Sequence, residues 1–185
     1  WVYSFSQLAR EDSGVESRGA DDEIDARPEL GYSRFSGTRF GNSLHAVLEK
    51  TAIGKWLDWS GDVPPHGEFE VVADALREQG YNGANDLVEG VPLLTRLVSE
   101  TLNVRLPEGA RLAALTDAAR CNEMGFHFAL APTRVPAILE LLHRFGIVVE
   151  RQAFGLRQRL EGLLTGRIDL VYEVDGRYYL LDYKS

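Results

Sequence analysis

The sequence predicts an α/β domain in which a helical lead-in precedes a mixed β-sheet. Apolar residues recur at helical spacing in several stretches of the first half of the chain, whereas a later stretch alternates apolar and polar residues. Two strand-like runs near the end are separated by Asp175-Gly176, the strongest short-range signal for a β-hairpin. A chain of 185 residues can bury a sizeable core, so one domain spanning residues 1–185 is the default expectation.

Composition narrows the class of protein. The chain is 44% hydrophobic and 26% charged, as in ordinary globular proteins, and no run approaches the roughly 18 apolar residues of a membrane span. No signal peptide is recognisable, so we expect a cytoplasmic location and no membrane partner. Because the chain opens on Trp1 without a Met, we expect it to be part of a longer protein. The lone Cys121 excludes an internal disulfide, and no Cys/His cluster has zinc-site spacing.

The charge balance argues against a protein that grips nucleic acid with its own surface. With 28 acidic and 20 basic residues, the formal net charge is -8, the wrong sign for phosphate binding. An acidic balance is compatible with a nuclease if the acids surround divalent metals, or if basic partner domains deliver the DNA. The charge therefore lowers the expectation of DNA binding without excluding it.

Two stretches precede the first predicted helix. Residues 1–8 mix aromatic and polar side chains, and we interpret them as a strand or cap packed on the core. Residues 11–37 are acidic, polar and glycine-bearing, with too few apolar side chains to offset the entropy lost on ordering. This second stretch predicts a flexible acidic loop within the domain.

Three helices are predicted in the first two thirds of the chain. The first follows Gly41 and Asn42, and its apolar face carries Leu44, Val47 and Leu48. His45 and Glu49 are four residues apart and project together from this helix. The other two helices are expected at residues 69–78, ended by Gly80, and at residues 85–102.

A strand and a further helix are predicted next. Residues 120–130 alternate apolar and polar side chains, which is typical of a half-buried strand. Thr133 is expected to cap a helix that runs through Phe145 and stops at Gly146. Pro136 lies close enough to the start of this helix to be tolerated there.

The final turn fixes which residues face one another across the predicted hairpin. A two-residue loop at Asp175-Gly176 pairs Val174 with Arg177, and each earlier residue with the one equally far along the return strand. We expect the strands to cover residues 166–174 and 177–184. One face of the hairpin is then apolar and carries Leu170, Tyr172, Tyr179 and Leu181.

The opposite face of the hairpin brings three charged residues together. Asp169 lies directly opposite Asp182, and Lys184 is two residues further along on the same face. Opposed side chains have Cβ atoms about 5 Å apart, where like charges are destabilising unless a cation lies between them. Mg²⁺ takes one or two carboxylates plus waters and phosphate, and a neighbouring lysine can stabilise charge on that phosphate or help deprotonate a water. These residues predict metal-assisted hydrolysis of a phosphodiester.

Simpler interpretations stay open. A hairpin can carry two surface aspartates, with Lys184 in a salt bridge to one of them. The apolar surroundings RIDLVY and YYLLDYKS favour a metal site, because unpaired charges are costly there. Trp56 and Trp59 could stack on nucleic-acid bases, but a core role is the preferred interpretation.

The motifs themselves resemble a known family. The segment GRIDLVYEVDGRYYLLDYKS is similar to the motif core of the RecB-type nuclease domain, the C-terminal domain of the exodeoxyribonuclease V beta subunit, within the PD-(D/E)xK nuclease superfamily. Upstream, FGNSLHAVLE resembles the family's histidine-bearing helix, RCNEMGFHF its Glu-bearing strand, and WVYSFSQL the start of its domain. The matches occur in family order, and they imply a restriction-endonuclease-like α/β core.

The resemblance implies roles for individual residues. It implies that His45, Asp169, Asp182 and the backbone carbonyl of Tyr183 bind Mg²⁺, with Mn²⁺ as a possible substitute. Asp169 and Asp182 would also act in catalysis, together with Lys184 as the catalytic lysine. Glu123 matches a family acid that supports the site. Glu49 could orient the His45 imidazole, but a solvated helix acid is an equally good interpretation.

The resemblance also implies a process and partners. It implies an Mg²⁺-dependent exodeoxyribonuclease acting on linear duplex ends or single strands in double-strand break repair and recombination. RecC-like and RecD-like subunits would be partners, and ATP would enter only through helicase domains, since no G-x-x-x-x-G-K-[ST] motif occurs here. Family members continue past the Asp-x-Lys strand to a helix with a Gln-x-x-x-Tyr motif. We therefore expect a C-terminally truncated core, incomplete and weak or inactive alone.

Two other function classes remain. A nuclease fold that lacks its final helix could serve only as a docking module for partner subunits or a single strand. The chain could also belong to a stand-alone endonuclease of the same superfamily with a different choice of substrate. Metal binding separates the first from a nuclease, and motor-domain sequence upstream would exclude the second.

Overall fold

The computed structural model describes residues 2–4, 34–146 and 157–183, and these form two compact units. The first unit contains strand β1 and Met124–Ile168. The second contains the described residues up to Glu123 and from Asp169 onward. The expectation of a single domain stays a prediction.

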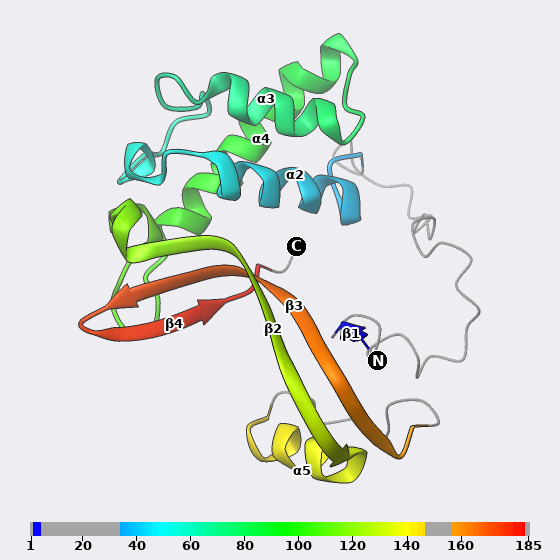
Figure 1. Ribbon diagram of the computed structural model, residues 1–185. Coiled ribbons are helices and arrows are strands. Elements are labelled where there is room, and N and C mark those ends of the chain that lie inside the picture. The colour runs from blue at the N-terminus through cyan, green and yellow to red at the C-terminus, as the bar shows by residue number, and fades with distance from the viewer. Residues whose placement is uncertain (1, 5–33, 147–156, 184–185) are drawn as a thin grey trace. The chain divides into compact units, whose positions relative to one another are not determined.

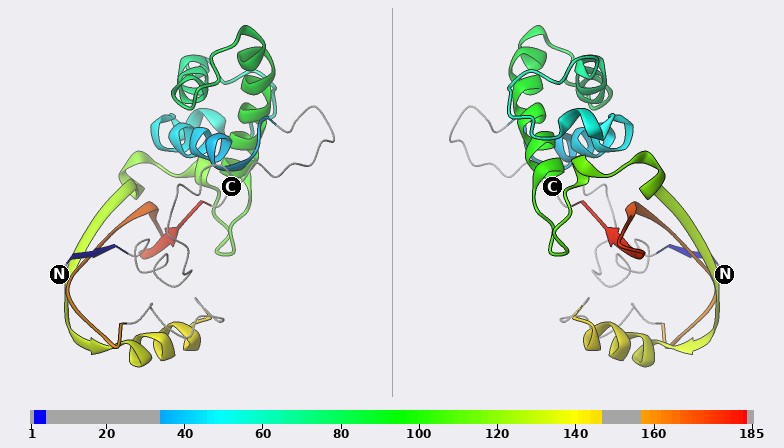
Figure 2. Two further views of the ribbon diagram at one scale, coloured as in Figure 1. Left: turned by 90° about the vertical axis from the view of Figure 1, so that its right-hand side faces the viewer. Right: turned by 90° about the vertical axis from the view of Figure 1, so that its left-hand side faces the viewer.

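Three helices form the body of the second unit. They are α2 (Gly37–Lys50), α3 (Phe69–Glu78) and α4 (Ala84–Asn103), and they pack against one another in all views (Figures 1 and 2). Short 3₁₀ turns follow at η1 (Ile53–Trp56), η2 (Leu112–Ala114) and η3 (Asp117–Ala119). The three predicted helices are confirmed, but α2 begins at Gly37. Gly41 therefore lies buried inside the helix instead of preceding it.

The helices enclose an apolar core. Val47, Leu76, Leu94 and Val98 are fully buried, with Trp56 beside them. The core role predicted for Trp56 is confirmed, because none of its surface is exposed. Trp59 is partly buried, packs against the same core and donates its indole N–H to the carbonyl of Val63, at 3.1 Å.

The two stretches ahead of α2 are described only in part. Val2–Ser4 forms strand β1, as the strand interpretation of residues 1–8 predicts, and the remainder of that stretch lies outside the described residues. Of the predicted acidic loop at 11–37, only residues 34–37 are described. There Phe35 is buried and stacks on Tyr81, while Gly37 begins α2.

Strands dominate the first unit. Strand β2 (Arg120–Arg134) and the long strand β3 (Arg159–Val174) are neighbours, and within this unit they run in opposite directions (Figure 1). β1 pairs with β3 in parallel, with Val2 opposite Leu163. Phe126 lies over Gly166, where a Cβ would come within 2.4 Å of the ring. β2 extends four residues beyond the predicted Leu130, because Thr133 belongs to the strand.

Helix α5 (Val135–Arg144) follows directly after β2. The predicted cap at Thr133 is wrong: its hydroxyl donates to the carbonyl of Ala131, at 2.7 Å, and the helix begins after Arg134. Pro136 is tolerated in the first turn because backbone N–H groups there have no partner within the helix. Gly146, at φ +67, lies just beyond the helix, as predicted.

The predicted hairpin and its register are confirmed in the second unit. β3 pairs antiparallel with β4 (Arg177–Leu181), and Val174 lies opposite Arg177. Asp175 and Gly176 have φ values of 52° and 72°, the positive values that a type I′ turn requires. The parallel and antiparallel pairings of β3 together make the predicted mixed sheet.

The hairpin's two faces also divide as predicted. Leu170 and Tyr172 are buried in the core of the second unit, whereas Leu180 on the other face is 66% exposed. β4 ends at Leu181, so the predicted strand through residue 184 is too long over the residues described. No helix within the three described ranges has the length and apolar character needed to cross a membrane.

Candidate functional site

His45 and Asp169 meet at the end of the hairpin. Nδ1 of His45, on α2, lies 3.7 Å from Oδ2 of Asp169, on β3, and the side chains are 32% and 16% exposed. The separation is too long for a hydrogen bond. It suits two donors that share a cation. The structure thus brings together two of the residues that the sequence singled out, and their roles stay a prediction.

Tyr183 completes this cluster. Its backbone N–H donates to Oδ2 of Asp169, at 2.8 Å, and its ring stands edge-on to the His45 imidazole, with centroids 5.6 Å apart. Burial raises the pKa of Tyr183 to about 12, helped by the charge of Asp169 and opposed by Arg120. The phenol is therefore neutral at physiological pH. The sequence singled out only its carbonyl, and the contact of its N–H with Asp169 was not anticipated.

The expected pair of Asp169 and Asp182 would come directly after the last paired residues of β3 and β4. The paired residues end at Leu170 and Leu181, and Asp182 follows as an exposed residue outside β4. The N–H that reaches Asp169 is that of Tyr183. Lys184 lies outside the described residues, so its catalytic role stays a prediction.

Glu123 occupies an unusual backbone position in β2. Its φ is +50°, in the left-handed region that side chains other than glycine seldom adopt. Such conformations cost about 1–3 kcal/mol and persist only where neighbouring contacts hold them. The side chain is half-buried. Its supporting role in the site stays a prediction.

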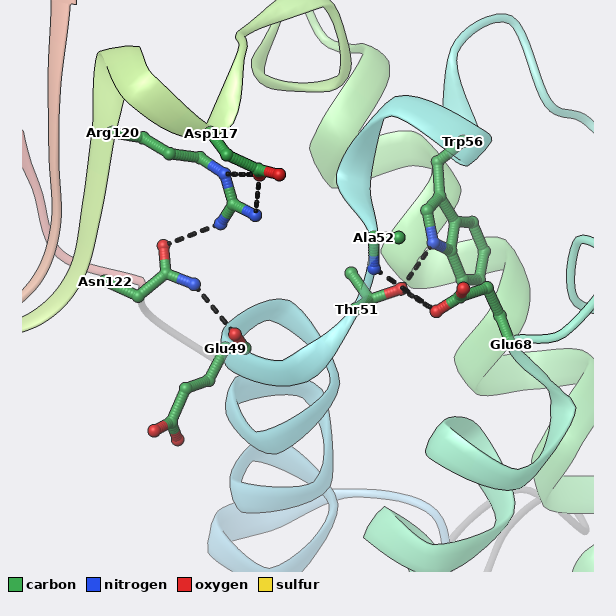
Figure 3. Close-up of polar contacts among 8 residues, drawn as sticks. All are labelled: Glu49, Thr51, Ala52, Trp56, Glu68, Asp117, Arg120 and Asn122. Carbon is green, nitrogen blue, oxygen red and sulfur yellow. Dashed lines mark hydrogen bonds and ion pairs between the residues drawn. The ribbon is translucent and has the colours of Figure 1, made fainter.

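Glu49 takes part through its backbone. Its carbonyl accepts a hydrogen bond from the Asn122 amide, at 2.8 Å, and its exposed carboxylate points away from that amide (Figure 3). The proposed contact between Glu49 and the His45 imidazole stays a prediction. Sequence reasoning missed Asn122, because its contact with Glu49 joins segments 73 residues apart, and no local pattern indicates such a contact.

His45 and Asp169 are suited to part of a metal site. Among the described residues, no three His, Cys, Asp or Glu side chains stand close enough together to hold a metal ion. Two donors that share one Mg²⁺ or Mn²⁺ with bonds of about 2.1 Å lie roughly 3–4 Å apart. The observed spacing of Nδ1 and Oδ2 falls in that range. Carboxylate and imidazole also belong to the donor types that divalent metals use in proteins.

Comparison with known proteins identifies the family. The PD-(D/E)XK nuclease superfamily matches residues 21–185, most of the chain. The chain belongs to this superfamily. A similar curated protein is RecB, a subunit of the RecBCD enzyme from Escherichia coli (strain K12), at 30% identity over 151 residues. That alignment covers 80% of this chain but only 12% of RecB.

The family assignment agrees with the geometry of this PD-(D/E)XK domain. The predicted RecB-type nuclease domain and its α/β core are confirmed. The superfamily's name describes an acidic residue followed by x-Lys, and Asp182-Tyr183-Lys184 has that form. In the Pro-Asp part of the name, Ile168 stands in place of proline before Asp169.

Proposed function

We propose that this chain is the metal-dependent nuclease domain of an ATP-dependent helicase-nuclease that hydrolyses DNA phosphodiester bonds. The observation that carries the proposal is the cluster of His45, Asp169 and Tyr183 at the hairpin end of a PD-(D/E)XK domain. The cluster joins two metal-type donors to Tyr183, the middle residue of the Asp-x-Lys sequence. The similarity to RecB supports a role of this kind.

In this proposal each candidate site residue has its own role. His45, Asp169, Asp182 and the carbonyl of Tyr183 hold Mg²⁺, or Mn²⁺ in its place. The N–H of Tyr183 orients the Asp169 carboxylate. Glu123 supports the ligands, and Glu49 assists through the helix that carries His45.

The reaction is an in-line attack of water on the scissile phosphate. A bound divalent cation supplies a polarised phosphate and a water that is more easily deprotonated. Lys184 stabilises the negative charge that develops on the phosphate oxygens, or helps to remove the proton from the attacking water. The half-buried cluster keeps its donors fixed, so little reorganisation is needed in the transition state.

The cellular role is an extension of the same proposal. We assign the chain to Mg²⁺-dependent exonucleolytic degradation of linear DNA during double-strand break repair and recombination. RecB is named as a subunit of the RecBCD enzyme, so RecC-like and RecD-like partners are proposed here as well. ATP would be used by helicase domains elsewhere in the full-length protein.

The test is digestion of linear duplex DNA by the full-length protein that contains this chain, in the presence and absence of Mg²⁺. We expect Asp169→Asn and Lys184→Ala each to lower the rate at least about a hundredfold, because each removes a group that acts on the phosphate or its metal. Asp175→Asn is the matched control. It removes a carboxylate from the same hairpin, at a position where asparagine accepts the positive φ.

Metal binding is measured separately, by calorimetric titration with Mn²⁺ in the absence of DNA. The parent and Asp175→Asn should bind Mn²⁺, and Asp169→Asn should bind it much more weakly. Full nuclease activity in both Asp169→Asn and Lys184→Ala would contradict the assignment of the site.

A non-catalytic docking module is the alternative. It is favoured by one observation: within the described ranges no group of three metal-ligating side chains is assembled. Such a module would bind no Mn²⁺ in the titration, and Asp182→Ala would not impair its docking of partner subunits. The same two experiments therefore separate the two functions.

A further inference from the structure

A chain of hydrogen bonds joins the start of β2 to the end of α2 (Figure 3). Nε and Nη2 of Arg120 donate to Oδ1 of Asp117, at 3.1 and 2.7 Å. Nη1 of the same guanidinium donates to Oδ1 of Asn122, at 3.0 Å. The amide of Asn122 then donates to the backbone carbonyl of Glu49, at 2.8 Å. Asn122 is thus held on one side and holds the helix on the other.

A second set of contacts holds the same end of α2 from another side. The hydroxyl of Thr51, the residue after the helix, donates to the buried carboxylate of Glu68, at 2.7 Å. The indole N–H of Trp56 donates in turn to that hydroxyl, at 2.6 Å. The helix end is therefore fixed through both of its flanks (Figure 3).

An open pocket of about 410 Å³ lies against this helix end, lined by Lys50, Thr51, Ala52, Asp117, Arg120 and Asn122. Its polar side chains already pair within the protein: Lys50 with Glu78, and the others through the two networks. We call the hydrogen-bonded chain from Asp117 through Arg120 and Asn122 to the Glu49 carbonyl the brace.

The hydrogen bond to Glu49 satisfies a backbone carbonyl at the end of the helix. The last four carbonyls of an α-helix have no partner within the helix. In α2 one of them, that of Glu49, is satisfied by a residue 73 positions later in the chain. His45 lies one turn before Glu49 on the same helix, so fixing this carbonyl also fixes the helix segment that carries the imidazole.

The backbone directly after Asn122 is also constrained. The next residue, Glu123, has the unfavourable φ of +50°, which requires neighbouring contacts to maintain it. The side chain of Asn122, anchored to both Arg120 and Glu49, supplies such contacts one residue away. The anchored side chain of Asn122 therefore directly precedes the strained residue.

We infer that Asn122 is a positioning residue for the candidate metal site. Its amide fixes the end of α2, which carries His45, against the start of β2, which carries Glu123, before any metal arrives. The part of this inference that concerns metal binding rests on the proposed function. It adds a residue that neither contacts the phosphate nor binds the metal.

The experiment compares Asn122→Ala and Asn122→Asp with Asn42→Ala. Asn42, on α2, is the matched control. Its side-chain amide also ties that helix to a neighbouring element, because it donates to the side-chain oxygen of Gln79, the residue that caps the end of α3, at 3.3 Å. Asn122→Asp retains the oxygen that accepts from Arg120 but cannot donate to the Glu49 carbonyl. Two readouts are taken: Mn²⁺ affinity by calorimetry, and amide hydrogen exchange of metal-free protein over residues 44–52 and 120–126.

We expect both Asn122 variants to weaken Mn²⁺ binding by about tenfold or more, the usual cost of losing a partner that orients ligands. Exchange should accelerate in the two named segments. Asn42→Ala should bind Mn²⁺ like the parent. Thermal unfolding midpoints of Asn122→Ala and Asn42→Ala should be similar, so that a general loss of stability does not explain the difference.

The outcomes keep the two proposals apart. If the parent binds Mn²⁺ and the Asn122 variants bind it as tightly, the positioning role is wrong and the proposed function stands. If the parent binds no Mn²⁺, the proposed function fails. Exchange in the metal-free protein then decides alone: faster exchange confined to the two segments supports the brace, and unchanged exchange overturns it.

Discussion

At the scale of single residues, Glu68 is a carboxylate kept ionised inside the protein. It is 3% exposed and accepts hydrogen bonds from the Lys55 ammonium, at 2.6 Å, the Thr51 hydroxyl and the Ala52 N–H. Burial raises the pKa of Glu68, but these hydrogen bonds together lower it below its usual value. The charge also lies at the N-terminal end of α3, where the helix dipole favours an anion.

This lowered pKa gives a prediction for acid stability. Ionised Glu68 stabilises the folded chain above the unfolded-state pKa of about 4.3, and that contribution is lost as pH falls through the lower folded-state value. We expect Glu68→Gln to reduce the free energy of unfolding at pH 7 by roughly 1–3 kcal/mol and to flatten the fall of that free energy as pH drops below the unfolded-state pKa. Urea unfolding at a series of pH values measures both effects.

The control for this prediction lies on the same helix. Glu70 is an exposed carboxylate paired with Arg77, at 3.2 Å. Glu70→Gln should leave both the stability at pH 7 and the acid slope nearly unchanged, because exposed ion pairs contribute little. If the two variants have the same acid slope, Glu68 does not carry the pH dependence.

The sequence predicts some of the site's residues better than others. The position of Asp169 on the hairpin follows from its two-residue turn, whereas His45 is singled out by the resemblance of its helix to the family's histidine-bearing helix. The brace at Asn122 could not be foreseen, since it depends on a backbone carbonyl and on an approach between segments 73 residues apart. Local patterns carry no information on such an approach.

At the scale of elements, α4 contains a glycine whose absent side chain matters. Gly90 is buried within the helix, and a Cβ at that position would lie 2.7 Å from Cε1 of Phe35 and 3.2 Å from Cδ1 of Leu76. The glycine therefore weakens the helix but lets the segment ahead of α2 pack against α4.

This contact gives a prediction in which two effects oppose each other. Helix propensity favours alanine over glycine by about 1 kcal/mol, but overpacking a core costs roughly 1–3 kcal/mol. We expect Gly90→Ala to lower the free energy of unfolding by about 1–2 kcal/mol, because the Phe35 ring must move. Denaturant unfolding provides the measurement.

A double-mutant cycle checks the cause. Phe35→Leu combined with Gly90→Ala should cost less than the sum of the two single changes. Gly54→Ala, where a Cβ would meet nothing within 4 Å, is the control and should be close to neutral. A gain in stability on Gly90→Ala would mean that Phe35 moves aside at little cost.

Element boundaries show where local reasoning fails. The hairpin register is confirmed in full across the paired residues, because turn chemistry alone sets it. The start of α2 and the cap of α5 were misplaced. Gly41 is buried inside α2, and Thr133 stays in β2, so burial and strand pairing override the local signals at these positions.

At the scale of the whole molecule, the net charge of -8 opposes binding to a polyanion. For the proposed function, the acidic site needs a cation before it can accept phosphate. The charge alone argued against DNA, whereas the family match assigns a nuclease superfamily. The two are compatible, because net charge averages over the chain, whereas chemistry depends on a few residues.

We therefore expect DNA binding by the chain to require a divalent metal. In Lys184→Ala, which should not cleave, a labelled single strand should bind in Mn²⁺ and not in EDTA at about 150 mM salt, because metal neutralises the carboxylates. Fluorescence anisotropy measures this binding. Adding Asp169→Asn should abolish the metal-dependent part, while equal binding with and without metal would indicate a separate basic surface.

The turn at Asp175 and Gly176 sets a limit on how this chain can change. Exposed loop tips usually tolerate insertions and deletions. Here one added residue would shift β4 by a position, turn Leu181 toward solvent and withdraw the N–H of Tyr183 from Asp169. The tip is free to vary in chemistry, provided that positive φ is allowed, but not in length.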